Sequence, residues 1–353
     1  MNAAPTAVLT DAPAQYAGSL ATELKDAVTP RAVALVLGAW VVAVAFMVSY
    51  VGAFHAPVPH RIPVAVVAPA QLVDELNSLT GEPLKADAAP NAETARERIM
   101  NRDADAALIL HDGAAPDVLL VASAAGSAVS QSIVQLTQQI ERTQGRQVSV
   151  TDVQAPNPKD GRGMSSFYLV VGLVIGGYLS TTALAMSGGY RPANLRRTLI
   201  RLAALAIQSI TLGLAGAVIV GPIYGALTGH FAALWAIGAL IAFTAAAVST
   251  ALQSLFGQLG VGFTLLFFVV LGNPSAGGVY TAPLLPPFWS AIGQSLPPGA
   301  ATTLVRNTAY FHGNGTTLAW WVLATWAASA VLLAGGACLR RAAQEQRRVP
   351  RWA

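Results

Sequence analysis

The chain has 353 residues, of which 54% are hydrophobic and only 11% are charged, and its formal net charge is +4. Because a typical soluble domain is roughly 25% charged, this composition excludes an ordinary soluble protein and indicates an integral membrane protein. The single cysteine, Cys338, excludes an intrachain disulfide.

The distribution of charge narrows the class of membrane protein. No Asp, Glu, Lys or Arg occurs from Leu202 to Val305, and no acidic residue occurs from Gly161 to Gln344. Ionisable side chains are costly inside hydrocarbon, and those that remain there usually form an ion relay. Ion-coupled carriers generally hold the coupling ion on such a carboxylate. A secondary carrier is therefore disfavoured, and any uphill transport is expected to draw energy from another subunit.

In chain order, residues 1–31 are expected to form a cytoplasmic leader. Within it, segment 14–29 places Tyr16, Leu20 and Leu24 at helical spacing, which predicts an amphipathic helix at the membrane interface. A frayed polar leader is the alternative.

Six windows of about 20 apolar residues follow, each long enough for a hydrocarbon core roughly 30 Å thick. They cover residues 32–54, 167–187, 202–222, 231–250, 254–272 and 317–339. The fourth and fifth windows are separated only by a weak break at Gln253, Gly257, Gln258 and Gly260, so one long broken helix is the alternative. The predicted fold is an α-helical polytopic membrane protein with six transmembrane helices and a small extracytoplasmic α/β domain inserted between helices 1 and 2.

Residues 55–166 have ordinary charge density and alternate between strand and helix patterns, which predicts that α/β domain. Strands are expected at 61–69, 82–89, 106–113, 116–125 and 147–154, and helices at 70–79, 91–105 and 126–145. Asn91 or Thr94 is expected to cap the second helix, and Gly145 to close the third.

Orientation follows from the basic residues, which remain cytoplasmic when they lie in short loops. The loop after the second span contains Arg191, Arg196, Arg197 and Arg201, and the tail 340–353 is also basic. Both termini are therefore expected in the cytoplasm, with 55–166, 223–230 and 273–316 outside. Residues 167–339 would form a five-helix membrane domain.

No catalytic pattern is present. The sequence has no HExxH, GxSxG or GxxxxGK[ST] motif, and its five histidines are scattered. The chain is expected not to be an enzyme and to hold no cofactor, so ATP and Mg, if used, would bind to a partner subunit.

The outer loop 273–316 is apolar, proline-rich and almost uncharged. This content predicts short helices that dip into the outer leaflet, with Tyr280, Trp289 and Tyr310 at the membrane interface. Packing between subunits is a second reading of the same content.

This layout of one span, an outer α/β domain and five further spans resembles the membrane subunits of ABC type-2 exporters. The segment Asn273 to Gly313, NPSAGGVYTAPLLPPFWSAIGQSLPPGAATTLVRNTAYFHG, is similar to the S-x-G-G, L-L-P-x-F-W and L-P-P-G-A pattern of the phage-infection-protein-like branch. The likeness of the α/β domain is one of layout alone.

The resemblance implies roles for specific residues. Segment 14–29 would be the elbow helix, and Pro283 to Arg306 would form re-entrant helices that close the exit. The loop that couples to the ATPase would comprise Arg191, Arg196, Arg197 and Arg201. The alternative for these arginines is that they only set the topology and contact anionic lipid. The outer re-entrant loop would include Asn273, Gly277, Gly278, Pro286, Trp289, Pro297, Pro298 and Arg306. Gln208, Gln253 and Gln258 are candidates for the path or the dimer seam, although hydrogen bonds between helices explain them equally.

The implied function is the permease subunit of an ATP-driven exporter of an amphipathic or lipid-like substrate, because the membrane region is apolar and free of charge. The implied partners are an ATPase subunit, a second permease copy or homologue, and membrane lipids, with no nucleic acid. The location would be a bacterial plasma membrane. The alternative is a non-transporting scaffold or surface receptor that acts through its outer domain.

Overall fold

The computed structural model describes residues 23–24, 27–111 and 115–348. The chain forms two compact units, Met1–Val44 and Ala45–Ala353, and the division falls inside the first long helix, α2 (Pro30–Phe54). The predicted amphipathic helix 14–29 lies almost entirely outside the described residues. The part of α2 in the first unit is apolar, as expected of a helix long enough to cross a membrane.

Among the described residues, five helices are long and apolar enough to cross a membrane. These segments are Ala32–Phe54 within α2, Ser165–Gly188 (α6), Leu195–Ile223 (α7, Leu195–Val218, with its π-helical extension η2, Ile219–Ile223), Phe231–Phe256 (α8), and Thr317–Gln344 within α13 (Thr317–Arg348). They make the protein a multi-pass membrane protein.

The predicted window 254–272 does not correspond to one helix of the structure, because helix α8 continues to Phe256 and stops there. Gly257 has φ of 63°, a conformation that favours glycine, and the chain reverses at this point. The next helical segment is the shorter Leu259–Ser275, composed of α9 (Leu259–Leu265), a π-helix η3 (Leu266–Gly272) and α10 (Asn273–Ser275). The reading of one long broken helix is therefore wrong, and the fifth predicted span is shorter than the other five.

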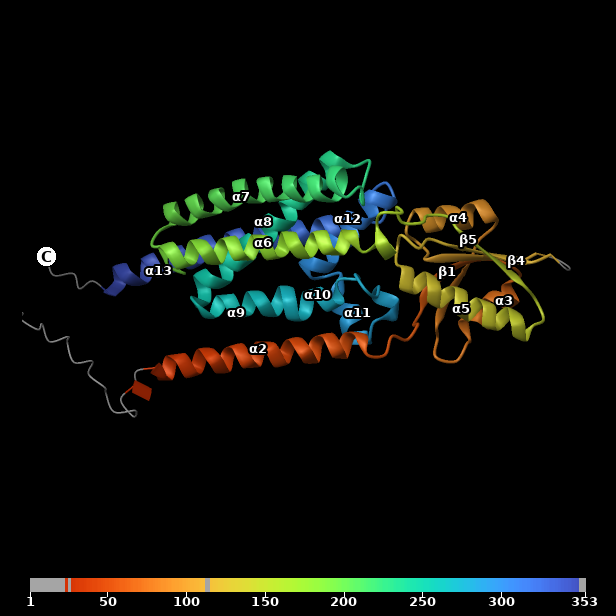
Figure 1. The fold of residues 1–353 in the computed structure, drawn as a ribbon, viewed down its shortest axis with the longest axis horizontal. Helices are drawn as coiled ribbons and strands as arrows, with labels where there is room; N and C mark the ends of the chain where they lie inside the picture. The colour runs from red at the N-terminus through yellow and green to blue at the C-terminus, as the bar shows by residue number, and fades with distance from the viewer. Residues whose placement is uncertain (1–22, 25–26, 112–114, 349–353) are drawn as a thin grey trace, which may run out of the picture. The chain divides into compact units, whose positions relative to one another are not determined.

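Helix α8 is the central helix of the bundle, and α6, α7 and α13 pack around it (Figure 1). Small residues allow this close packing. A Cβ atom at Gly177 of α6 would lie 2.4 Å from the carbonyl oxygen of Ala242, and one at Gly213 of α7 would lie 2.4 Å from the amide nitrogen of Ala239. Such small-residue contacts are typical of helices that pack within membranes.

The outer loop folds into short helices, as predicted. They are the 3-10 turn η4 (Ala282–Leu284), α11 (Pro287–Gly293) and α12 (Pro297–Tyr310). Proline occupies the first turn of both α11 and α12, where its missing N–H has no helical partner to lose. Helix α12 is largely buried and packs against α6, α8 and α13.

The α/β domain contains one five-stranded sheet of order β2-β1-β3-β4-β5. Its strands are β1 (Ile62–Val67), β2 (Leu84–Ala88), β3 (Ala106–Ile109), β4 (Asp117–Val121) and β5 (Val148–Asp152). Only β3 and β4 pair antiparallel, and Val64 of β1 lies in register with Ala86 of β2 and Ala106 of β3.

Helices α3 (Ala70–Asn77), α4 (Ala92–Met100) and α5 (Ser127–Thr143) complete the domain. Each predicted strand and helix of this domain is present. Asn91 caps α4, because its side chain accepts the Thr94 N–H at 2.8 Å. The chain leaves α5 through Gly145, which has φ of 67°.

The two faces of the sheet have different surroundings. The face under α3 and α5 has its own apolar cluster, which includes Ile62 and Ile133. The opposite face, under α4, contributes Ala107 and Ile99 to the same cluster as Leu304 and Phe311 of the bundle. The α/β domain and the helical bundle therefore share one hydrophobic core.

Candidate functional site

The predicted coupling loop lies at one end of the bundle, where several helix C-termini meet. Arg191 Nη2 donates to the carbonyl of Leu255 at 3.2 Å, and Arg341 Nη1 of α13 donates to the neighbouring carbonyl of Ser254 at 2.9 Å. Both carbonyls belong to the last turn of α8. Carbonyls in a last turn lack helical partners and carry partial negative charge, so cations stabilise them. The basic loop and the basic tail thus share what we name the basic end.

Arg201 has a similar role at the end of α6, because its Nη2 donates to the carbonyl of Gly189 at 3.1 Å. Arg196 and Arg197 are different. Asn194 caps α7 by accepting the Arg197 N–H at 2.9 Å, which places both arginines in the first turn of α7 with exposed side chains. A helix dipole disfavours cations in its first turn. The four predicted residues therefore divide into Arg191 and Arg201, which donate to carbonyls at helix ends, and the pair Arg196 and Arg197, which lies exposed in the first turn of α7.

The three glutamines do not form one site. Gln253 is buried near the end of α8 and donates to Ser249 Oγ at 3.0 Å. Gln208 is half-buried on α7, and Gln258 is exposed in the turn after α8. Gln253 Nε2 also donates to Thr182 Oγ1 of α6 at 3.4 Å, which is a hydrogen bond between two helices.

The predicted outer-loop residues occupy structural positions around α11 and α12. Gly277 accepts a hydrogen bond from Arg306, and Gly278 lies against Phe167, whose ring would be 2.4 Å from a Cβ atom there. Asn273 shares a side-chain hydrogen bond with Tyr50. Pro286 precedes α11, and half-buried Trp289 lies on that helix. Buried Pro297 and Pro298 begin α12.

One of the three expected interfacial aromatic residues, Tyr310, is placed differently from the prediction. Tyr310 is only 8% exposed, and its hydroxyl donates to Asp160. Tyr280 packs partly against the apolar cluster of the α/β domain. Tyr310 is therefore not at a lipid interface but in the contact between the α/β domain and the bundle, because its hydroxyl requires a partner once the ring is buried.

This contact is named the junction and comprises Asp160, Arg306 and Tyr310. Asp160 is 1% exposed and accepts the N–H of Ser165 at 2.8 Å in addition to the Tyr310 hydroxyl. Arg306 is 6% exposed and donates through Nη2 to the carbonyl of Gly277 at 2.8 Å. Asp160 acts on this cation through space, since no carboxylate in the described ranges approaches the Arg306 guanidinium within ion-pair distance of 4 Å.

A second set of contacts lies beside the junction. The Arg102 guanidinium pairs with Asp105 at 2.7 Å and lies over the ring of Phe311, 4.8 Å from its centroid. Asn314 Nδ2 donates to the carbonyl of Met100 at 3.1 Å. These contacts join the end of α4 to the end of α12.

The segment Tyr280–Leu285, named the strap, provides the third connection. Leu284 is 2% exposed and belongs to the apolar cluster beneath α3 and α5. The N–H of His60 donates to the carbonyl of Pro283 at 2.9 Å. A residue of the outer loop thus completes the core of the α/β domain.

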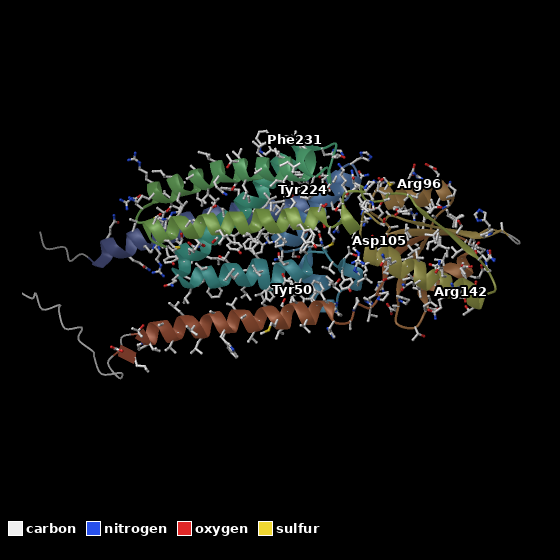
Figure 2. All side chains as sticks on the ribbon, viewed as in Figure 1. Tyr50, Arg96, Asp105, Arg142, Tyr224 and Phe231 are labelled. Atoms are coloured by element: carbon white, nitrogen blue, oxygen red, sulfur yellow. The ribbon has the colours of Figure 1, made fainter. Side chains whose placement is uncertain are left out.

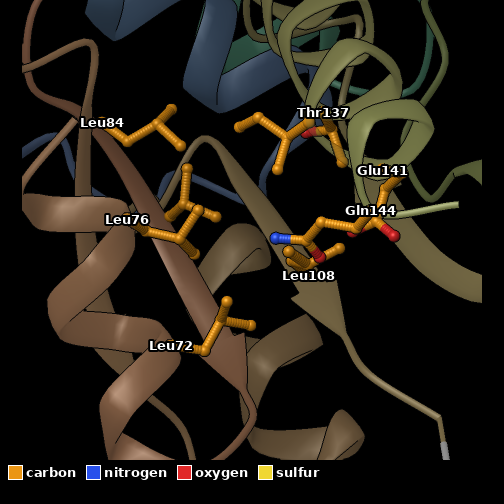
Figure 3. Close-up of a pocket in the computed structure, with 9 residues that line it drawn as sticks. Leu72, Leu76, Leu84, Leu108, Thr137, Glu141 and Gln144 are labelled. Atoms are coloured by element: carbon orange, nitrogen blue, oxygen red, sulfur yellow. The ribbon is translucent and has the colours of Figure 1, made fainter. Parts of the chain in front are cut away.

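The α/β domain contains a small cavity that is lined mainly by apolar side chains. Leu72, Leu76, Leu84 and Leu108 line it together with Thr137, Glu141 and Gln144 (Figure 3). Its free volume of about 10 Å³ has room for about one water molecule. This cavity is too small for an organic ligand.

Glu141 lies between this cavity and Asp117. Arg146 binds Asp117 through Nη2 and Nε, both at 2.6 Å, and approaches Glu141 at 3.5 Å. Burial and the neighbouring Asp117 raise the pKa of Glu141 to about 7. Burial alone would raise the pKa of Asp117, but hydrogen bonds from Arg146 and the His111 N–H hold it below its ordinary value. The pair is a structural element of the domain.

Charged side chains such as Arg96, Asp105 and Arg142 gather on the α/β domain, whereas the bundle is mainly covered by carbon (Figure 2). Within the part of the chain that the structure describes, no group of three or more His, Cys, Asp or Glu side chains could hold a metal ion.

Sequence reasoning missed the junction and the strap. One sequence feature could have indicated that Asp160 is important, since it is the last acidic residue before the long acid-free stretch. No sequence feature distinguishes Leu284, because it is one apolar residue in an apolar loop. No family model, curated protein or solved structure matches this chain.

Proposed function

We propose that this protein is the permease subunit of an ATP-driven exporter and that a separate ATPase chain powers it. The observation that carries the proposal is the pair Arg196 and Arg197, exposed in the first turn of α7 beside the closely packed basic end. Cations at this position oppose the α7 dipole, and an acidic surface on a partner would compensate them, as would anionic lipid headgroups. A groove on an ATPase subunit would provide that surface.

The lack of acidic side chains supports a separate energy source. Residues 161–344 include α6, α7, α8 and α12 and contain no Asp or Glu. This part of the chain therefore has no carboxylate to hold a coupling proton or sodium ion. ATP and Mg would be bound by the partner chain, and this subunit would not itself be an enzyme.

We infer six membrane crossings, with Leu259–Ser275 as the fifth. This segment starts next to Gly257, which contacts Arg191 at the basic end, and leads to Gly277, which binds Arg306 near the α/β domain. At 1.5 Å per residue it covers roughly 25 Å, close to the thickness of the hydrocarbon core. A tilted or locally thinned bilayer accommodates the difference.

Aromatic side chains support this placement. Tyr224 and Phe231 are exposed where α7 ends and α8 begins (Figure 2), as is Trp235 of α8. Trp320 and Trp321 are exposed near the start of α13. These positions lie at the end of the bundle opposite the basic end. Aromatic residues gather at membrane interfaces, and basic residues remain on the cytoplasmic side. We therefore infer cytoplasmic termini, an outer α/β domain and a location in a bacterial plasma membrane.

An amphipathic or lipid-like molecule is the substrate class that fits best. Exposed apolar side chains cover the bundle, and α11 presents Phe288 at 57% exposure. A hydrophilic glycan would require a path lined by aromatic and carboxamide groups, whereas Gln253 is occupied by a hydrogen bond within the bundle. Two copies, or one copy and a homologue, would form the path together.

The test is purification in mild detergent from the native cells, with every co-purifying chain identified by mass spectrometry. The wild type is compared with Arg196→Glu/Arg197→Glu. Arg340→Glu is the matched control, because Arg340 is also an exposed arginine, placed on α13 just before Arg341 of the basic end. We expect a P-loop ATPase with the wild type and the control, and about tenfold less with the double variant, since several charge pairs across an interface are lost.

An oligomer without ATPase in all three preparations would contradict the exporter proposal and favour a scaffold or receptor. Equal ATPase recovery in all three would reject Arg196 and Arg197 as the contact.

A further inference from the structure

The outer helix pair, α11 and α12, is connected to the α/β domain on both sides. On one side, the strap inserts Leu284 into the core of the domain, and Pro283 accepts the hydrogen bond from His60. Helix α11 begins at Pro287, directly after the strap and Pro286. So short a connection leaves little slack, and withdrawal of Leu284 from the core would be required before α11 could move far.

On the other side, the junction makes separation electrostatically costly. Arg306 and Tyr310 lie one helical turn apart on α12, and Asp160 lies on the segment that returns from the α/β domain to α6. Moving α12 away from Asp160 would break the Tyr310–Asp160 hydrogen bond and weaken the attraction between buried Asp160 and buried Arg306.

The strap and the junction are linked to each other. Arg306 holds the carbonyl of Gly277, a few residues before the strap, through its Nη2 donor. The end of α12 is also held at the end of α4 by Asn314 and Phe311. Displacement of the α/β domain would therefore act on both ends of the outer helix pair at once.

We propose that the α/β domain and the outer helix pair move as one body and that the strap transmits displacement of the domain to α11 and α12. The physiological meaning of this coupling rests on the proposed exporter function. In such an exporter, the α/β domain would hold the exit closed through α11 and α12.

The structure offers a reversible lock for the strap. A Cβ atom built at Gly126, just before α5, lies 3.9 Å from the Cβ of Thr281, within the range of about 3.5–4.5 Å for a disulfide. The contact of 2.8 Å with Thr281 Cγ2 disappears when Thr281 becomes cysteine. The test variant is Gly126→Cys/Thr281→Cys, in a Cys338→Ala background that removes the only native thiol.

Hydrogen exchange of the full chain in lipid nanodiscs is measured for the oxidised and the reduced variant. We expect oxidation to slow backbone exchange of α11 and α12 by about fivefold or more and reductant to reverse the effect, because the lock suppresses local opening. The single variant Gly126→Cys, with Cys338→Ala, controls for the oxidant. Unchanged exchange of α11 and α12 after complete oxidation would overturn the proposal.

A second variant tests the opposite direction. Leu284→Asn places a polar group in the core and should accelerate exchange in both the α/β domain and α11. Val279→Asn is the matched control, because Val279 precedes the strap and is 44% exposed. Faster exchange in the α/β domain with no change in α11 and α12 would also overturn the proposal. The disulfide variant decides the matter if Leu284→Asn does not fold.

These measurements require neither ATP nor substrate, so they separate the coupling from the exporter function. Export by the oxidised and reduced disulfide variant is then compared in vesicles that also contain the ATPase. Export that is blocked by oxidation and restored by reductant would support both proposals. No export by the wild type would reject the exporter function, while the exchange data would still decide the coupling.

Discussion

Arg196 and Arg197 differ from the other arginines of the basic end in what their side chains contact. Arg191, Arg201 and Arg341 donate to carbonyls at helix ends, where a cation adds to stability. Arg196 and Arg197 face solvent at the opposite end of a helix dipole. The sequence grouped the four loop arginines together, because spacing shows that they are near one another but not which carbonyls they reach.

Glu141 gives a prediction of pH dependence. The folded-state pKa of about 7 lies above the unfolded value of about 4.3, so the folded protein binds more protons between these values. Stability from this group is complete below about pH 4 and is lost as pH rises through 7. Glu141→Gln removes the titration. We expect the wild type to melt at a lower temperature at pH 8 than at pH 5, and the variant to show a smaller difference.

The effect should be on the order of 2 kcal/mol, reduced from the full shift because Asp117 and Glu141 titrate together. Thermal melting of the detergent-purified proteins at the two pH values measures it. All other ionisable groups are the same in both proteins. A pH difference as large in the variant as in the wild type would rule out the role of Glu141.

At the scale of secondary-structure elements, the contact between α6 and α8 depends on Gly177. A Cβ atom there would meet the backbone of Ala242 at 2.4 Å, whereas one at Gly172 on the same helix meets nothing within 4 Å. Gly177→Ala should therefore separate the helices and destabilise the protein by about 1–3 kcal/mol, as overpacking does. Gly172→Ala should be neutral or slightly stabilising, because alanine is the better helix former.

Thermal melting and the monodisperse yield after size-exclusion chromatography compare the two variants. Equal behaviour of Gly177→Ala and Gly172→Ala would mean that α6 and α8 are not closely packed at this point.

The elements themselves were predictable to different degrees. The strands and helices of the α/β domain were all predicted, because alternating or helical apolar spacing marks each one, and Asn91 caps α4 as expected. The fifth span was predicted too long at its start, because hydropathy does not register the helix end at Gly257. Leu284 and Tyr310 could not be placed from sequence, since their partners are distant in the chain and no local pattern marks them.

At the scale of the whole molecule, the α/β domain has its own sheet and helices, but its hydrophobic core includes residues of the helical bundle and the strap. Its α4 face shares a core with the bundle, and its α5 face is completed by Leu284. Removing residues 61–160, which would otherwise distinguish a receptor from a permease, would also expose the bundle core. A change that leaves both parts in place and folded is needed, and the disulfide between positions 126 and 281 provides one.

The shared core leads to a prediction for the isolated domain. A fragment of residues 61–160 would lose the bundle side of the cluster that contains Ile99 and Ala107, and it would lack Leu284. We expect this fragment to bind an apolar dye and to lack the sharp thermal transition of a packed core. Calorimetry and dye fluorescence measure both properties. A cooperative transition with no dye binding would show that the shared core is not required.

The central claim is that a separate ATPase drives this permease, and lipid translocation in reconstituted vesicles tests it most directly. A fluorescent lipid is followed with permease and ATPase together, with each alone, and with Arg196→Glu/Arg197→Glu. We predict ATP-dependent translocation only when both chains are present, falling about tenfold in the double variant as the coupling contact is lost. Translocation driven by a proton or sodium gradient without the ATPase, or none under any condition, would contradict the account.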